Sequence, residues 1–346
     1  MSNNSNSTLF VLSHAQKGLI KIVDVRNFIH NKIQTPMLCF GVLGNLLIIV
    51  YFLNLNWNKL RRMSSYHFLL INLAICDALA CGGTAFLFHF LWELDKFGCE
   101  YVMNVFVNIC PMASCLLLII MSYARYRRIV TPFKKRLNKK QYSIVCVVIW
   151  ILSSLTYLHY FINRKVVEVN GNLQCMYFGP EFANQLYAFV WDIFVAVTIM
   201  VYFYIKIEKR LDHEENSNRS SLSDSSRQRN RLVLRTLKAL IVVYTIFAYP
   251  GRIFAMIGNT LYYYGSKENP PNQDMMNAGI ALVHIVAIFL YYSNNIFNVF
   301  VYYKVMPEFR EFILRVMTLG LYKKQNEVSP PIEITNTTND QAESYN

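Results

Sequence analysis

Charged residues are scarce in this chain, and cysteines do not form a disulfide framework. Only 16% of the 346 residues are charged and 54% are hydrophobic, whereas a soluble globular domain has about 25% charged residues. Six of the eight cysteines lie within apolar runs, where cysteine behaves as a small buried hydrophobe. The composition therefore argues against an ordinary soluble domain and indicates a membrane protein.

The sequence also lacks a basic domain, a cleavable signal and internal repeats. Its net charge of +13 would suit nucleic acid, but Lys and Arg alternate with apolar spans instead of gathering on one face, so no nucleic-acid partner is expected. The first thirty residues contain no sustained apolar stretch with a cleavage site. We therefore expect the first spanning helix to act as the insertion signal.

Apolar segments long enough to cross a bilayer occur seven times. About 20 mostly apolar helical residues span a bilayer core, and such segments lie at 34–57, 66–92, 99–126, 141–163, 184–206, 232–259 and 277–303. The pattern predicts an all-α membrane protein, a seven-transmembrane helix bundle over residues 34–303. Residues 1–33 would form an N-terminal tail.

Basic residues predict which side each loop faces. Seven Lys and Arg lie between Arg127 and Lys140, whereas the first outer loop carries only Lys96. By the positive-inside rule, the N-terminus is extracellular, the C-terminus is cytoplasmic, and the protein is a multi-pass protein of the plasma membrane. Asn3 and Asn6 lie in glycosylation triplets that agree with an extracellular tail.

Two polar regions are predicted on the cytoplasmic side. The stretch 212–229 is rich in Ser, Asn and charge, which is typical of a mobile loop. After the last span, Phe309, Phe312, Ile313 and Val316 recur at helical spacing. This spacing predicts an amphipathic helix at 304–320 in contact with membrane lipid, followed by a cytoplasmic tail at 321–346.

Polar side chains inside the spans are informative, because a charge at the bilayer centre costs roughly 2.5–3.5 kcal/mol. In chain order they include Asn45, Asp77, Ser114, Arg125-Tyr126, Asn294, Asn295, Asn298 and Tyr302, with Trp150, Tyr204 and Pro250 between them. This order resembles the rhodopsin-like family of G-protein-coupled receptors, over nearly everything from Gly44 to Met317.

The resemblance implies a receptor and not an enzyme. An extracellular ligand would shift the population of a bistable helix bundle and so activate a heterotrimeric G protein. It also implies a disulfide between Cys99 and Cys175. The residues implied in switching and G-protein contact are Arg125, Tyr126, Tyr204, Pro250, Asn298 and Tyr302.

Several positions depart from the family pattern. Ala124 replaces the carboxylate beside Arg125, Val299 replaces the proline after Asn298, and Ala248 replaces an aromatic residue. The start of span six, at 228–231, offers no acid, so little electrostatic restraint holds Arg125 inward. This favours raised basal activity, and the alternative is a receptor that couples weakly or not at all.

The polar group around Asp77 resembles the family's buried sodium site. Asn45, Ser114, Asn294, Asn295 and Asn298 would surround this carboxylate with oxygen atoms, which suits a hard cation. The alternative is a hydrated hydrogen-bond network around a protonated carboxyl group. Apart from this possible sodium ion, no cofactor is expected.

The resemblance also places a ligand pocket between spans three, five, six and seven. Its walls would include Val107, Asn108, Met112, Asp192, Arg252, His284, Ile288, Tyr291 and Tyr292. Val107 stands where amine receptors have aspartate, and Tyr292 where opsins have the retinal-binding lysine, so a peptide or another small molecule is favoured. Arg252 would either pair with Asp192 or bind a carboxylate or an amidated peptide end.

Two other classes of membrane protein have sequence features that this chain lacks. A transporter or channel would show repeats, broken helix pairs or a continuous polar path, and none is visible in the sequence. An intramembrane enzyme would need paired catalytic residues at one depth, and Asp77 and Asp192 lie in spans that are not expected to meet. His89, His159 and His284 share no metal-ligand spacing.

Overall fold

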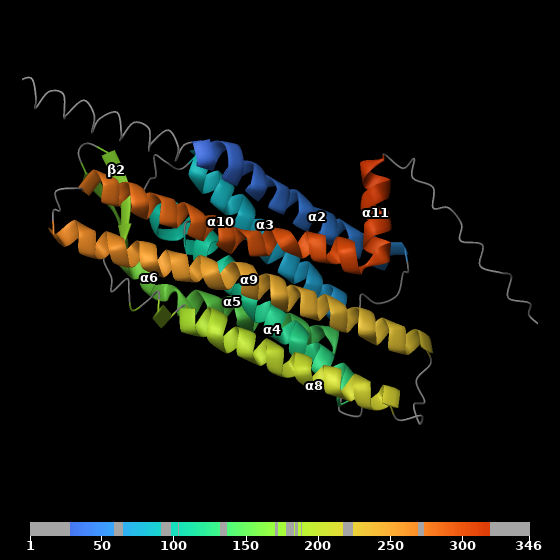
Figure 1. The fold of residues 1–346 in the computed structure, drawn as a ribbon. Helices are drawn as coiled ribbons and strands as arrows, with labels where there is room; N and C mark the ends of the chain where they lie inside the picture. Colours follow the sequence, from blue (N-terminus) through green and yellow to red (C-terminus); the bar gives the residue numbers. More distant parts are fainter. Residues whose placement is uncertain are drawn as a thin grey trace, which may run out of the picture.

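The computed structural model describes residues 28–58, 65–90, 98–102, 104–131, 137–169, 172–177, 183, 186–187, 189–216, 224–268 and 273–318. Its long helices run side by side as one elongated bundle (Figure 1). They are α2 (Thr35–Asn58), α3 (Ser65–Phe90), α4 (Cys110–Ile129), α5 (Lys139–Thr156), α8 (Ala196–Asn216), α9 (Asp224–Glu268) and α10 (Gln273–Val305).

Shorter elements complete the two ends of the bundle. The helix α6 (Leu158–Asn163) leads into an antiparallel hairpin of β1 (Arg164–Val169) and β2 (Asn172–Tyr177). At the opposite end, α11 (Pro307–Met317) lies across the bundle (Figure 1). The π-helical turns are η1 (Ile29–Gln34), η2 (Gly98–Val102), η3 (Val105–Ile109) and η4 (Phe189–Val195).

Six of these helices are long and apolar enough to cross a membrane, over Lys32–Asn54, His67–Ala85, Val105–Ile129, Phe189–His213, Asn230–Gly258 and Ile285–Val305. A shorter apolar helix covers Lys140–Thr156. Its 18-residue element α5 is about 27 Å long at 1.5 Å per residue, and α6 continues it after one interrupted residue, Tyr157. The predicted helical membrane bundle is confirmed. The helices α5 and α6 occupy the position of the remaining predicted span, at 141–163.

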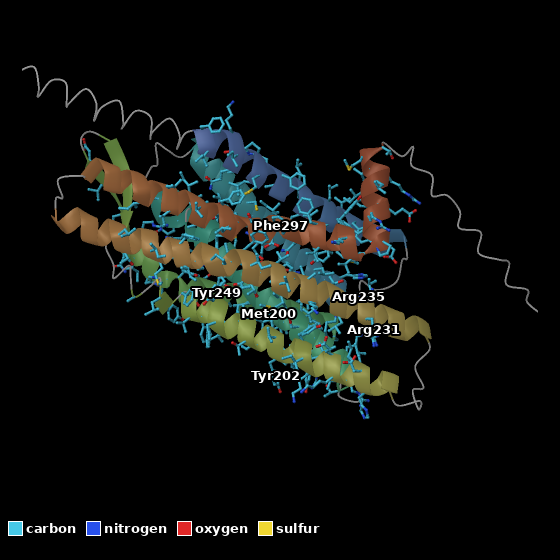
Figure 2. The ribbon with its side chains drawn as sticks, in the orientation of Figure 1. Met200, Tyr202, Arg231, Arg235, Tyr249 and Phe297 are labelled. Carbon is cyan, nitrogen blue, oxygen red and sulfur yellow. The ribbon has the colours of Figure 1, made fainter. Side chains whose placement is uncertain are left out.

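The bundle has a lipid-type surface, with large apolar side chains pointing outward as well as inward. On α8, Met200 is buried while Tyr202 is 52% exposed on another face, and Tyr249 of α9 and Phe297 of α10 also lie on the outside (Figure 2). In water such a surface would promote association. In a bilayer the hydrocarbon chains cover it.

The prediction of a mobile loop at 212–229 is wrong at both ends. The helix α8 continues to Asn216, and α9 begins at Asp224, while residues 217–223 lie outside the described part of the chain. Hydropathy marks only the part of a helix that contacts lipid, whereas the backbone hydrogen bonds continue through polar residues into water. Asp212 and Arg231 therefore stand on helices, at fixed positions.

The helix α11 packs against the end of the bundle through one of its faces. Phe309 and Ile313 are buried, whereas Val316 is exposed. The Phe309 ring lies 5.2 Å from the ring of Tyr51 on α2 and 6.3 Å from that of Tyr302 on α10. Aromatic contacts thus join α11 to the first and last spans.

Gly251 allows α9 to approach the backbone of α10. A Cβ atom built at Gly251 would lie 2.9 Å from the backbone nitrogen of Tyr291 and 3.1 Å from the carbonyl oxygen of Ala287. Backbone atoms cannot rotate away as a flexible side chain can, so any larger residue would push the two helices apart. The close approach places Arg252, the next residue, beside Tyr291.

We predict that Gly251→Ala lowers the free energy of unfolding by about 1–3 kcal/mol through overpacking. Gly279→Ala is the matched control, because a Cβ atom at Gly279 has no neighbour within 4 Å and alanine favours a helix over glycine. Thermal unfolding of the purified protein in lipid nanodiscs measures both. An equal effect of the two substitutions would contradict the proposed close contact.

Candidate functional site

Asp77 is the centre of a hydrogen-bonded group that joins three helices. The residue is completely buried on α3. Its Oδ1 accepts a hydrogen bond of 2.7 Å from Ser114 Oγ on α4, and its Oδ2 accepts one of 2.6 Å from Asn298 Nδ2 on α10. Both oxygen atoms therefore have a donor from another helix, which meets the demand that a buried carboxyl group makes.

Asn45 connects this group to α2. Its Nδ2 donates to the carbonyl oxygen of Gly41 at 2.9 Å and to that of Asn295 on α10 at 3.1 Å. The side chain of Asn294 donates to Asn295 Oδ1 at 3.4 Å. The structure thus brings Asp77 and the five polar residues predicted around it into the interfaces between α2, α3, α4 and α10.

Some polar atoms of this group have no hydrogen-bond partner among protein atoms. They include Asn45 Oδ1 and Asn294 Oδ1, both buried. Buried polar atoms in native proteins are usually satisfied by protein, water or an ion, and neutral oxygens beside a carboxylate are ligands that a hard cation accepts. Within the described residues, no cluster of three or more His, Cys, Asp or Glu residues offers another metal site.

Near the hairpin end of the bundle, Arg252 of α9 lies among tyrosines. Its Nη2 donates to the hydroxyl group of Tyr291 on α10 at 2.7 Å and to that of Tyr157 at 3.3 Å. Its guanidinium carbon also lies 4.4 Å from the centre of the Tyr291 ring. These contacts orient the planar guanidinium group from two sides.

The neighbouring pocket residues pack around these tyrosines. Met112 of α4 is buried in one cluster with Tyr157, and Ile288 packs near Tyr291 and Tyr292. The hydroxyl group of Tyr292 accepts a hydrogen bond of 2.8 Å from Thr84 on α3. Val107 is half-buried. The side chains of Asp192 and His284 lie outside the described part of the chain, so a contact between Asp192 and Arg252 stays a prediction.

A second polar cluster lies between η3 and the hairpin. Asn108 Nδ2 donates to Asn104 Oδ1 at 3.2 Å, and Arg164 Nη1 donates to the same atom at 2.9 Å. The Arg164 guanidinium group also lies 5.2 Å from the centre of the Tyr160 ring. Only Asn108 of this cluster was predicted in the pocket. Asn104 lies near the start of predicted span three, and Arg164 follows the end of predicted span four, so neither position indicated the pocket.

Tyr157 is the main residue that the sequence did not indicate. The helix breaks between α5 and α6 at this residue, which has φ −103° and ψ 13°, and its side chain is 2% exposed. No proline or glycine marks the break. From the sequence alone, a tyrosine in an apolar span is typical of a lipid contact, and its buried position depends on how the neighbouring helices pack.

The residues implied in switching lie toward the other end of the bundle. Arg125 is buried on α4, beside Ala124, and the ring of Tyr126 lies 5.3 Å from that of Phe203 on α8. The Tyr204 hydroxyl group donates to Glu208 Oε1 at 2.6 Å. Tyr302 is buried against Phe52, at a ring distance of 6.5 Å, and Pro250 stands within α9.

A disulfide between Cys99 and Cys175 and glycosylation at Asn3 and Asn6 were predicted on the extracellular side. Cys99 is buried in η2 and is disulfide-bonded, whereas six other cysteines are free. Cys175, whose backbone pairs with Val166 in the hairpin, is the remaining cysteine of the sequence. Its side chain lies outside the described part, so the Cys99–Cys175 pairing stays a prediction. Asn3 and Asn6 lie outside the described residues.

Comparison with known proteins decides the family. Residues 44–302 match the model of the 7 transmembrane receptor (rhodopsin family). The chain belongs to this family. Similar relatives of this rhodopsin-family receptor are type-1 angiotensin II receptors of Sus scrofa, 23% identical, and Homo sapiens, 22% identical. Each similarity covers 298 residues, 80% of this chain and 77% of the relative.

Membership in the family confirms the predicted rhodopsin-like receptor and its multi-pass membrane architecture. The matched region begins at Gly44, next to Asn45, and ends at Tyr302. It therefore includes Asp77, Arg125 and Arg252.

Proposed function

We propose that this receptor binds an extracellular ligand through a carboxylate or an amidated peptide end at Arg252. The receptor then activates a heterotrimeric G protein at its basic inner face, and its N-terminus is extracellular. The orientation of Arg252 by Tyr157 and Tyr291 is the observation that supports the ligand class. A guanidinium fork held in one plane matches the two oxygen atoms of a carboxylate.

The relatives support a ligand-activated receptor but not a particular ligand. They are named as receptors for angiotensin II, and at 22–23% identity this name does not carry over to the present chain. The pocket is therefore argued from its own residues. Val107 and Tyr292 offer neither a carboxylate for an amine nor a lysine for retinal.

We predict that Arg252→Gln weakens activation by a carboxylate-bearing agonist by about 2–5 kcal/mol, because the variant loses a charged partner inside the bundle. The agonist would come from paired free-acid and amidated peptide libraries, with nucleotide exchange on the G protein as the readout. Arg252→Lys keeps the charge but loses the forked guanidinium group, so its agonist potency should lie between those of the original chain and Arg252→Gln. Unchanged agonist potency in Arg252→Gln at matched surface expression would refute the role of Arg252.

For the inner face, we propose that the missing carboxylate at Ala124 leaves Arg125 weakly restrained and basal signalling high. Arg125 is buried at the end of α4, where it would meet the G protein when the bundle opens. A carboxylate beside it would favour the inward position. The second candidate is a receptor that couples weakly, favoured by the replacements at Val299 and Ala248.

We predict that Ala124→Asp lowers ligand-free G-protein activation about fivefold, the effect of an ion pair near 1 kcal/mol. Ala124→Asn is the control, since it has the same shape without the charge. Equal ligand-free activity in the original chain and the Asp variant would count against weak restraint of Arg125. Absence of activation in both would favour the weakly coupling receptor.

We also propose that a sodium ion binds beside Asp77. Asp77 and Ser114 would hold it, together with the buried oxygen atoms of Asn45 and Asn294 that lack a protein donor. A bound cation would neutralise the buried carboxylate and stabilise the closely packed arrangement of the helices.

We predict that sodium raises the melting temperature of the purified receptor and that Asp77→Asn abolishes this effect. At ten times the dissociation constant, the ion stabilises the folded state by about 1.4 kcal/mol. Thermal unfolding in sodium chloride and in choline chloride at equal ionic strength measures the difference. Ser122→Ala is the control, because the buried Ser122 hydroxyl donates to Leu118 of its own helix and should leave the sodium effect intact.

A further inference from the structure

An apolar groove of about 220 Å³ runs between α4 and α5. It is lined by half-buried side chains of α4 and by side chains of α5 that are mostly exposed, among them Leu116, Ile119, Ile120, Ile144, Val148 and Leu152. Because its α5 wall is exposed, the groove opens toward the bilayer and not into the bundle.

The side chains fix the shape of the groove. Six of its eight lining residues are Ile or Val, and a β-branched side chain in a helix has one strongly preferred χ1 rotamer. Hydrocarbon is as apolar as these side chains, so a lipid that binds them gains van der Waals contact and not hydrophobic free energy. A chain lying between two helices gains more such contact than a chain on a convex face.

The groove has the length of one leaflet or less. Ile144 and Leu152 are eight residues apart, which is about 12 Å along a helix axis. The hydrocarbon core of a bilayer is about 30 Å thick, so each leaflet contributes about half of that. The groove therefore fits part of an acyl chain from one leaflet.

A lysine stands at one end of this groove. Lys140 lies four residues before Ile144, in the same row as Val148 and Leu152, and residues four apart share a helix face. The helix α5 begins at Lys139 and leads toward α6 and the hairpin. Lys140, whose side chain is exposed, is therefore at the end of the bundle that bears α11.

The start of α5 holds Lys140 in a fixed place. The Asn138 side chain accepts a hydrogen bond of 2.9 Å from the backbone nitrogen of Gln141, and the Gln141 side chain accepts one of 2.9 Å from the backbone nitrogen of Asn138. This capping box fixes the first turn, which contains no acidic residue. The positive end of the helix dipole disfavours a lysine there, and a bound anion would offset both charges.

A second basic residue lies toward the same end on α4. Arg127 follows Ile120 by seven residues, a spacing that keeps both on one face of a helix. The positive charge of Arg127 is close enough to act on the hydroxyl group of Tyr142 on α5. Both walls of the groove thus lead to a basic residue.

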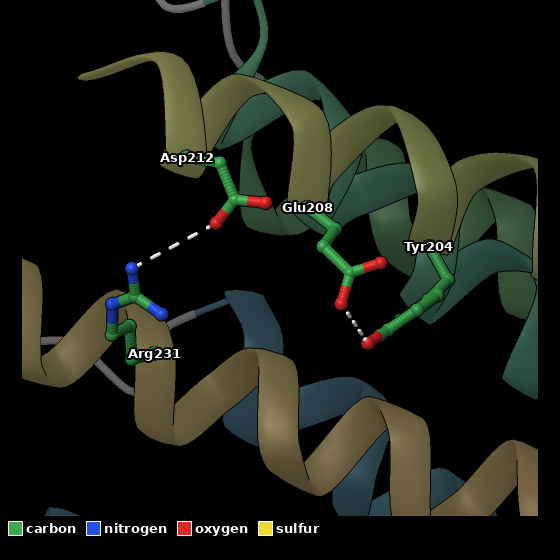
Figure 3. Close-up of polar contacts among 4 residues, drawn as sticks. All are labelled: Tyr204, Glu208, Asp212 and Arg231. Atoms are coloured by element: carbon green, nitrogen blue, oxygen red, sulfur yellow. Dashed lines mark hydrogen bonds and ion pairs between the residues drawn. The ribbon is translucent and has the colours of Figure 1, made fainter. Parts of the chain in front are cut away.

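The acidic groups described toward this end have other partners. Figure 3 shows Glu208 and Asp212 of α8, which contact Tyr204 and Arg231. Within the described part of the chain, Lys140 forms no ion pair. The charge at this end of the groove is therefore complementary to an anion from outside the bundle.

We propose that the groove binds one acyl chain of an anionic phospholipid whose headgroup contacts Lys140. The groove supplies the contact area for the chain, and the lysine selects a negatively charged headgroup. Basic residues near a membrane surface attract anionic lipids, and an ammonium group is a point-charge donor to phosphate. The proposal goes beyond the receptor function and depends on neither the ligand nor the G protein.

Photocrosslinking tests this lipid site. The probe is phosphatidylserine with a diazirine group in one acyl chain, at low mole fraction in phosphatidylcholine nanodiscs that hold one receptor each, so that no second copy covers the groove. Peptide mapping after illumination should find cross-links concentrated at 116–120 and 144–152. An excess of unlabelled phosphatidylserine, but not of phosphatidylcholine, should reduce them.

The headgroup contact is tested at Lys140. Lys140→Gln should reduce cross-linking in the groove about fivefold, the effect of one basic residue at the membrane surface. Lys140→Arg keeps the charge and should label like the original chain. Lys209→Gln is the control, because Lys209 is an exposed lysine of α8 outside the groove.

The groove itself is tested by filling it. Val148→Phe places a ring where the chain would lie and should remove most of the cross-links. Val147→Phe is the matched control, because Val147 is 58% exposed and is not among the residues that line the groove. Thermal unfolding of both variants in the same nanodiscs shows whether they are folded.

The outcomes separate this lipid from other occupants. Selective labelling that is lost in Lys140→Gln and Val148→Phe but kept in both controls supports the proposal. Equal labelling by phosphatidylserine and phosphatidylcholine probes, or cross-links spread evenly over the outer faces of α2 and α5, overturns it in favour of ordinary bilayer lipid. Displacement of the probe by cholesterol but not by unlabelled phosphatidylserine assigns the groove to a sterol and also overturns it.

Discussion

The buried carboxyl group of Asp77 sets the arrangement of the inner bundle. Inside a bilayer no water compensates an unpaired polar group, so the neighbouring helices must present donors to both carboxylate oxygens. Ser114 of α4 and Asn298 of α10 do so. These two hydrogen bonds tie α3, α4 and α10 together at one level of the bundle.

The helix α10 carries this constraint to both ends of the molecule. Tyr291 lies seven residues before Asn298, about two turns or 10 Å along a helix, and contacts Arg252 of α9. Tyr302 lies one turn after Asn298 and packs near Phe52 and Phe309. Arg252 therefore contacts the same helix, α10, whose Asn298 donates to Asp77 and whose end borders α11.

The inner end is held differently from the family pattern. Ala124 offers no carboxylate beside Arg125, and among the described residues Glu208 and Asp212 of α8 carry acidic groups toward this end. Their described contacts are half-buried or exposed, and are thus weaker than the completely buried group around Asp77. The polar group at the centre of the bundle is thereby more completely buried than the acidic residues of α8 toward the α11 end.

Much of the fold was predictable from the residues themselves. Apolar stretches of spanning length mark membrane helices because a bilayer core excludes unpaired backbone and charge. The order of Asn45, Asp77, Arg125 and Asn298 along the sequence indicates the family without reference to the tertiary structure. Helix ends were less predictable. The continuation of α8 and α9 into 212–229 was missed, since polar helical turns and polar loops have similar composition.

The amino-acid sequence by itself determined the membrane class, the number of apolar segments and the polar residues that a bilayer forces together. Only the tertiary structure decided which of these residues meet. Tyr157 reaches Arg252, Thr84 reaches Tyr292, and Asp212 reaches Arg231, although each pair comes from different helices. Periodicity specifies the face of a helix on which a side chain lies, but the partner across that face depends on how the helices pack.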